Sequence, residues 1–118
     1  MSNIVPLALR ALAQVRYMHW MTTNYIVHKE LGTLYEQLDP LVDRLVESYL
    51  GTTATATNLT SLKLALEGVN ENETYIDKLF GIKRQFKSVR ENLDSALQNI
   101  IDEITGAIDQ SLYLIKLT

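Results

Sequence analysis

A column of acidic residues is the first feature of this sequence that could bind a ligand. Asp39, Asp43 and Glu47 recur at every fourth position, so a continuous helix would stack them along one side, away from its leucine face. Like charges at this spacing repel by roughly a few tenths of a kcal/mol per pair, and only Arg44 offers local relief. The column therefore indicates a bound cation, basic groups from a neighbouring chain, or an acidic face in contact with solvent.

Two histidines could add nitrogen donors to such a site. His19 falls on the apolar stripe of a predicted helix, where an aliphatic side chain is expected. An imidazole that points inward or into an interface must find a partner. Taken alone, His19 and His28 are more typical of hydrogen-bonded core histidines than of metal ligands, and both interpretations stay open at this point.

The elements that must position these side chains are four amphipathic helices. In each, apolar residues recur at spacings of three and four, which is the period of one helix face. Pro40 removes a backbone hydrogen bond within the second helix, so we expect a kink or a break there, with Asp39 able to cap the second half. The predicted helices cover residues 4–23, 25–50, 73–89 and 92–117.

A long connection joins the second and third helices. Residues 51–58 are rich in threonine and predict a loop. Residues 59–69 fit either a short helix or an extended crossing segment, and the spacing of Leu59, Leu62 and Leu66 favours the helix. Together these elements predict an all-α fold, a four-helix antiparallel bundle that occupies residues 1–118 as a single domain.

The composition excludes several classes of function. The 118 residues include no cysteine, so disulfides, thiolate metal sites and cysteine nucleophiles are excluded. The net charge of -3 disfavours nucleic acid, and DNA binding is not expected. Arg10 interrupts the N-terminal apolar stretch before it could form a signal core or a membrane span, so we expect a cytoplasmic protein with no membrane partner.

Part of the sequence resembles the Dps family of ferritin-like proteins. The resemblance rests on the pair His19-Trp20, on His28, and on Asp43 fifteen positions later with Glu47 four positions beyond it. It covers about residues 5–51, and the remainder is similar only in its helix pattern. Small phage-encoded proteins with the same core of histidines, tyrosine and acids look like the nearest relatives.

The resemblance implies a ferritin-like (Dps-like) bundle with a ferroxidase site shared between two subunits. Carried over by position, His19, Asp43 and Glu47 would be metal ligands, and His28 a second-site ligand or a water holder. The protein would then be a homo-oligomer, at least a dimer, that binds iron, with zinc or no metal as the alternatives. Iron accepts imidazole and carboxylate together, and iron oxidation is the candidate activity.

The sequence departs from the family's pattern in three places. Gly32 stands where the family usually has an acid, four positions after the second histidine. The two histidines lie closer together than in the family, and a lysine-rich N-terminal extension is absent. Gly32 and the shorter link between the histidines favour a second class of function, a non-catalytic phage accessory or virion-associated interaction protein that retains the bundle.

A basic cluster ends the third predicted helix and opens a third interpretation. Cations at this place complement the helix dipole and can pair with acids on the second helix or on a neighbouring chain. The alternative is a site for a small anionic ligand, which no glycine-rich loop supports. The cluster consists of Lys83, Arg84, Lys87 and Arg90.

Overall fold

The computed structural model describes residues 4–52, 64–69 and 73–118, which form four α-helices and no strand. The predictions of an all-α fold and of four helices are confirmed, with the observed ends within three residues of the predicted ones. The helices are α1 (Ile4–Met21), α2 (Tyr25–Thr52), α3 (Tyr75–Arg90) and α4 (Ser95–Lys116).

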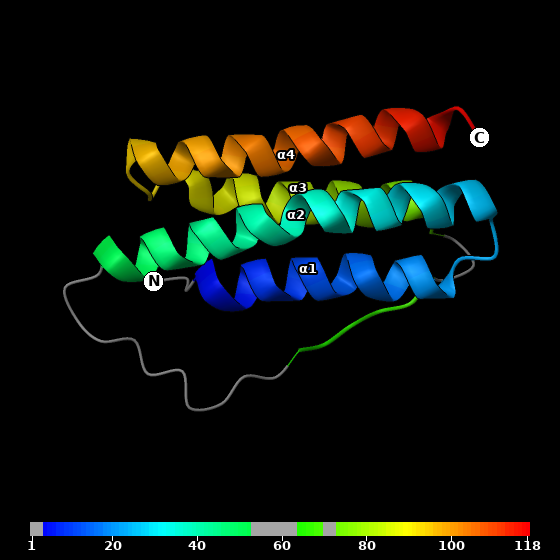
Figure 1. Cartoon of the computed structure of the whole chain (residues 1–118), viewed down its shortest axis with the longest axis horizontal. Helices are drawn as coiled ribbons and strands as arrows, with labels where there is room; N and C mark the ends of the chain where they lie inside the picture. The colour runs from blue at the N-terminus through cyan, green and yellow to red at the C-terminus, as the bar shows by residue number, and fades with distance from the viewer. Residues whose placement is uncertain (1–3, 53–63, 70–72) are drawn as a thin grey trace.

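Each helix runs antiparallel to the helices that it packs on. In Figure 1, α1 and α4 point towards one end of the bundle, and α2 and α3 point towards the other. α2 packs against both α1 and α4, α3 packs against α4, and α1 makes a smaller contact with α3. Because α2 and α3 are parallel, the chain between them must return along the length of the bundle.

The core is built from the apolar stripes of all four helices. α4 carries the longest stripe, with Ile101, Ile104 and Ile108 fully buried. Burying one such side chain favours folding by roughly 1.5–3 kcal/mol relative to leaving it exposed. The other helices contribute the large buried side chains Ile4, Val15, Met18, Leu31, Leu34, Leu38, Leu45, Leu79 and Phe86.

Side-chain caps fix where α3 and α4 begin. Thr74 and Asp77 form a capping box, in which each side chain accepts a hydrogen bond from the other residue's backbone N–H at 3.0 Å. The Asp94 side chain accepts from the backbone N–H of Leu97 at 3.0 Å. These bonds satisfy backbone donors that have no partner within the first turn of a helix.

Pro40 does not divide α2 in two. The helix continues through it to Thr52, so of the two predicted outcomes, a kink or a break, the break is wrong, and Asp39 lies inside the helix and caps nothing. Pro40 is exposed, so the backbone carbonyl left without its usual donor can bind water instead. Leu38 and Val42 on either side are buried, and their packing holds the helix together across the missing hydrogen bond.

The helix favoured for residues 59–69 is wrong for its second half, because residues 64–69 are not helical. Residues 53–63, which include most of the predicted loop and the first half of this segment, lie outside the described residues. Figure 1 shows residues 64–69 running alongside α1. None of the described helices is long and apolar enough to cross a membrane.

Replacing Pro40 with alanine should stabilise the protein. Pro40→Ala restores the missing backbone hydrogen bond and removes the clash of the ring with the preceding turn, a gain of roughly 3 kcal/mol. The more flexible unfolded chain offsets about 1 kcal/mol of this. We therefore expect urea denaturation followed by circular dichroism to give a free energy of unfolding about 2 kcal/mol higher. Gln37→Ala, at an exposed position one turn earlier, is the control, and an unchanged or lower stability of Pro40→Ala would contradict the account of α2.

Candidate functional site

His19 and His28 meet where α1 ends and α2 begins. The Nδ1 atom of each ring lies 2.7 Å from the backbone carbonyl oxygen of the other residue. A carbonyl oxygen can only accept, so each Nδ1 carries a hydrogen and donates it. The rings stack with their centroids 3.9 Å apart and their planes 17° apart. We call this reciprocal pair the histidine clasp, and it ties the last turn of α1 to the first turn of α2.

Gly32 makes room for the clasp. A Cβ atom at this position would lie 2.9 Å from Cε1 and 3.2 Å from Nδ1 of His19. These distances are too short for ordinary contact, and the ring cannot swing away without breaking its bond to His28. Packing of α2 against α1 therefore requires glycine at position 32.

The two imidazoles cannot bind one metal ion together in this arrangement. The lone pair of a ring nitrogen lies in the plane of the ring, and planes only 17° apart and stacked do not converge within the roughly 2 Å of a metal–nitrogen bond. In a neutral imidazole with its hydrogen on Nδ1, Nε2 keeps a lone pair. The structure thus brings His19 and His28 together as a helix clasp.

The acidic residues lie elsewhere on α2. Asp39, Asp43 and Glu47 are exposed, and the rise of a helix places Asp43 about 22 Å along α2 from His28. Among the residues that the structure describes, no group of three histidine, aspartate or glutamate side chains could hold a metal ion. The four predicted ligands therefore do not meet within one chain, and a site shared with a second subunit stays a prediction.

Two residues of the basic cluster of α3, Lys83 and Arg90, pair with acids of α4. Lys83 Nζ lies 2.6 Å from Asp109 Oδ1, and Arg90 donates to both carboxylate oxygens of Asp102 at 2.8 and 2.9 Å. The hydrogen bond from Arg90 lowers the pKa of Asp102 below its ordinary value. The prediction that these cations have a structural role is consistent with the contacts, but their partners are on α4 and not on α2.

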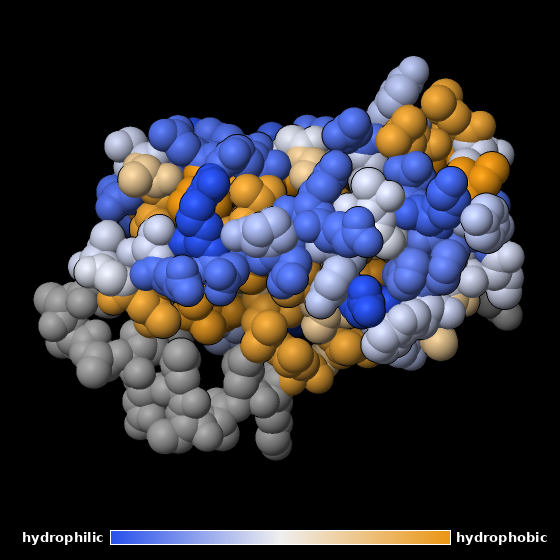
Figure 2. Space-filling model, in the orientation of Figure 1, coloured by the Kyte–Doolittle hydropathy of each residue, from blue (hydrophilic) through white to orange (hydrophobic). Residues whose placement is uncertain are grey.

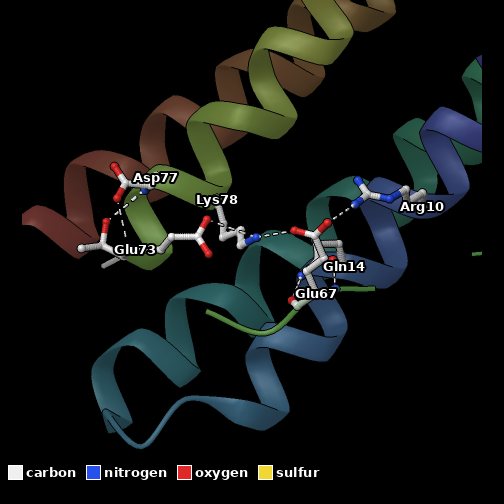
Figure 3. Close-up of polar contacts among 7 residues, drawn as sticks. Arg10, Gln14, Glu67, Glu73, Asp77 and Lys78 are labelled. Atoms are coloured by element: carbon white, nitrogen blue, oxygen red, sulfur yellow. Dashed lines mark hydrogen bonds and ion pairs between the residues drawn. The ribbon is translucent and has the colours of Figure 1, made fainter. Parts of the chain in front are cut away.

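Residues 64–69 are held against α1 and α3 by polar side chains, and we call them the strap. The carboxamide of Gln14, which is buried, donates to the backbone oxygen of Glu67 at 2.7 Å and accepts from its N–H at 3.0 Å. Arg10 Nε donates to the backbone oxygen of Ala65 at 2.9 Å. Figure 3 shows the Glu67 carboxylate between Arg10 and Lys78, whose Nζ lies 2.6 Å away. These bonds explain why the strap is extended, since side chains replace the backbone partners that a helix would supply.

Lys78 is the main cause of a perturbed pKa in the strap. Its hydrogen bond lowers the pKa of Glu67 below the ordinary value of 4.5. Because the pKa of Glu67 is lowered in the folded state, its ion pair with Lys78 stabilises the folded protein at pH values above 4.5. This stabilisation is lost as the pH falls through the lowered pKa of Glu67. The strap contacts were not predicted from the sequence, although Gln14 between the buried Ala11 and Val15 indicates a buried polar partner.

Large apolar and aromatic side chains are exposed around the α1–α2 turn. The exposed fractions are 61% for Trp20, 53% for Met21, 72% for Tyr25 and 53% for Ile26. We call these four residues the turn patch. Arg16, one turn before Trp20, adds a guanidinium group to the same end of the bundle. The turn patch was not predicted from the sequence, in which Trp20 was considered only as part of the family resemblance.

The turn that carries the patch is held by side-chain bonds. Asn24 Oδ1 accepts from the backbone N–H groups of Ile26 and Val27 at 2.9 and 3.1 Å, and Thr22 Oγ1 accepts from the N–H of Asn24 at 3.2 Å. These bonds act with the histidine clasp, so the patch sits on a fixed turn.

The fold and these contacts define a four-helix bundle closed by a histidine clasp and a strap. A family of unknown function (DUF5856) matches residues 19–115, and the chain belongs to this family. It is also similar to an uncharacterized 14.6 kDa protein from the mobD-ri intergenic region of Enterobacteria phage T4. The two are 29% identical over 114 residues, which span 94% of this chain and 84% of the relative. No solved structure gives a significant match.

Membership of the Dps family, expected from the sequence, is wrong. The matching family is one of unknown function, and its match spans most of the chain, including both histidines. The structure supplies a physical reason for the misleading pattern: the close spacing of His19 and His28 and the glycine at position 32 are what the clasp requires.

The clasp predicts a different effect for each of two glycine substitutions. Gly32→Ala should lower the free energy of unfolding by roughly 1–3 kcal/mol, because the new methyl group overlaps the His19 ring. Gly106→Ala, in α4 with open space around it, should raise stability by roughly 0.5–1 kcal/mol, as alanine does in a helix.

A double-mutant cycle read by urea denaturation isolates the cause. In a His19→Ala background the ring is gone, so Gly32→Ala should become neutral or stabilising, like Gly106→Ala. If Gly32→Ala costs the same with and without the ring, the clasp does not explain the glycine.

Proposed function

We propose that this protein is a non-catalytic phage accessory protein that binds a partner protein through the turn patch. The observation that carries the proposal is the exposure of Trp20, Met21, Tyr25 and Ile26 together on one short turn. Tryptophan, tyrosine and arginine are the residue types that dominate binding energy at protein interfaces. Apolar side chains gathered at one exposed place are typical of interaction sites.

The rigidity of the turn supports the same function. A surface that is already ordered loses less conformational entropy on binding than a mobile loop does. The clasp and the Asn24 cap fix the turn independently of any partner. Both devices are therefore useful to a protein whose role is to present a binding surface.

The phage T4 relative supports the biological setting. It is a phage protein of similar length, and this chain covers 84% of it. An accessory or virion-associated role in a phage fits a small helical bundle whose polar contacts serve to hold it together. The cytoplasm of the infected host is the compartment that we propose for it.

Site-specific photo-crosslinking during infection tests the proposal. A photoreactive amino acid at Tyr25 should capture one reproducible phage or host protein, identified by mass spectrometry. The same amino acid at Gln110, exposed on α4, is the control and should not capture it. Capture at Tyr25 should fall strongly when Trp20→Ala is added. Equal capture from both positions, or capture that Trp20→Ala leaves unchanged, would remove the support for the turn patch.

A homo-oligomeric protein that binds iron or zinc between subunits is the second candidate function. The observation that favours it is the open Nε2 of each histidine, since ligating histidines commonly donate Nδ1–H to a carbonyl oxygen. His19 or His28 of one subunit would then meet Asp43 and Glu47 of another. Iron oxidation would be its activity.

Metal analysis combined with native mass spectrometry separates the two candidates. Under the interaction function we expect background metal content in the wild-type protein and no change in Asp43→Ala or Glu47→Ala. Near-stoichiometric iron or zinc in a dimer or larger assembly, lost in both variants, would establish the metal function instead. His28→Ala is a poor probe here because it also breaks the clasp.

A further inference from the structure

We propose that the surface beside Arg16 binds an extended segment of a partner protein in which a carboxylate adjoins an apolar side chain. This inference rests on the proposed function and names the chemistry of the partner. It is carried by the position of the Arg16 guanidinium, by an apolar hollow next to it, and by the way α1 holds the strap.

The Arg16 guanidinium lies against two aromatic rings and has no acidic partner among the described residues. Its Cζ atom lies 4.5 Å from the centroid of the Tyr35 ring and 5.4 Å from that of Trp20. Within residues 4–52, 64–69 and 73–118, no hydrogen bond or ion pair involves Arg16. Stacking occupies the faces of a guanidinium and leaves its N–H edge open, and that edge matches a carboxylate with two parallel hydrogen bonds.

An apolar hollow of about 250 Å³ adjoins this guanidinium. Apart from Arg16, its walls are aliphatic and aromatic side chains of α1, α2 and the strap. They come from Leu9, Leu12, Ala13, Tyr17, Trp20, Tyr35 and Leu66. If a carboxylate of the partner bound Arg16, an apolar side chain next to it in the partner could therefore fill the hollow. Figure 2 shows hydrophobic side chains reaching the surface along the edge where α1 and the strap lie.

The strap shows that α1 can hold a segment of this kind. Leu66 forms a wall of the hollow, and the next residue, Glu67, is held by its backbone through Gln14 and by its carboxylate near Arg10. The same helix thus already holds the backbone of an extended chain beside the hollow, while the nearest cation to the acid of that chain is Lys78 of α3. Arg16 lies further along α1 and offers a cation beside the same hollow to a second segment.

A partner of different sequence fits this surface better than a second copy of the chain. A symmetric dimer with its two-fold axis at Arg16 would bring two guanidinium groups together, and like charges oppose such a pairing. An acidic residue of another protein neutralises the cation instead. We therefore assign the site to a partner with a negative charge beside its apolar anchor.

Selection from a library of random twelve-residue peptides, followed by NMR titration, tests the inference. The selected peptides should carry aspartate or glutamate within two positions of a leucine, isoleucine, methionine or phenylalanine. In ¹⁵N-labelled protein, the best peptide should shift the Trp20 indole Nε1–H and the amides of Ala13 and Tyr17. A library that yields no binder at this surface overturns the inference.

Matched substitutions identify the carboxylate contact. Arg16→Ala should weaken peptide binding about tenfold or more, as expected for a hydrogen-bonded charge pair. Arg16→Lys, which keeps the charge but not the planar fork, should recover only part of this loss. Lys29→Ala removes an exposed cation on α2 and should leave the affinity unchanged. Because Arg16 is exposed, circular dichroism should confirm that all three variants fold.

A change in the peptide completes the cycle. Replacing its acid by the corresponding amide should weaken binding to the wild-type protein about tenfold and should have little effect on Arg16→Ala. Equal affinity of the acid and amide peptides for the wild-type protein overturns the inference. So does self-association through this surface, seen by native mass spectrometry as a dimer that Trp20→Ala dissociates.

Failure of the inference can be told from failure of the proposed function. If crosslinking at Tyr25 captures a partner and Arg16→Ala does not reduce that capture, the turn patch binds a protein and the carboxylate site is refuted. If Tyr25 captures no partner, the proposed function itself fails.

Discussion

The reciprocal hydrogen bonds between His19 and His28 are the constraint on which the α1–α2 end of the protein depends. The last carbonyl groups of a helix have no partner within the helix. The ring of His28 supplies one for α1, at the backbone oxygen of His19. The ring of His19 returns the bond to α2. One contact therefore satisfies a helix end, sets the crossing of two helices and imposes a glycine at position 32.

Charge is used mainly to hold elements together in the rest of the bundle. Lys83 and Arg90 join α3 to α4, Arg44 joins α2 to α4 through Glu103, and Lys78 holds the strap. Such exposed ion pairs contribute little stability each, but they fix which faces meet. Arg16 differs because its guanidinium rests on aromatic rings. That contrast is why a structural explanation suffices for Lys83 and Arg90 and a binding explanation is preferred for Arg16.

Periodicity predicted the four helices because the apolar stripes that bury Leu34, Ile104 and Phe86 are local patterns. A kink or a break at Pro40 was predicted from backbone chemistry alone, whereas the packing of Leu38 and Val42 keeps the helix continuous. Periodicity could not decide between a helix and an extended segment for the strap, since its conformation depends on Gln14 and Arg10, which lie more than fifty positions earlier in the chain.

The candidate site was harder to predict than the fold. His19 and His28 were identified as residues that need partners, and they are partners of each other. Sequence spacing could not reveal this, because the same two imidazoles can face a metal or a carbonyl depending on the turn between them. The turn patch was missed for another reason: exposure of Trp20 and Tyr25 depends on what the rest of the chain leaves uncovered.

The histidine clasp and the strap contacts join residues at very different sequence separations, and this difference favours one order of folding. The clasp joins residues nine positions apart, whereas the bonds from Gln14 and Arg10 to the strap span 53 and 55 positions. Closing a short loop costs less chain entropy and is faster. The α1–α2 hairpin can thus form as an early nucleus, and the strap closes only after α1 offers its side chains. A nascent chain would accordingly acquire its aromatic end before its last two helices are in place.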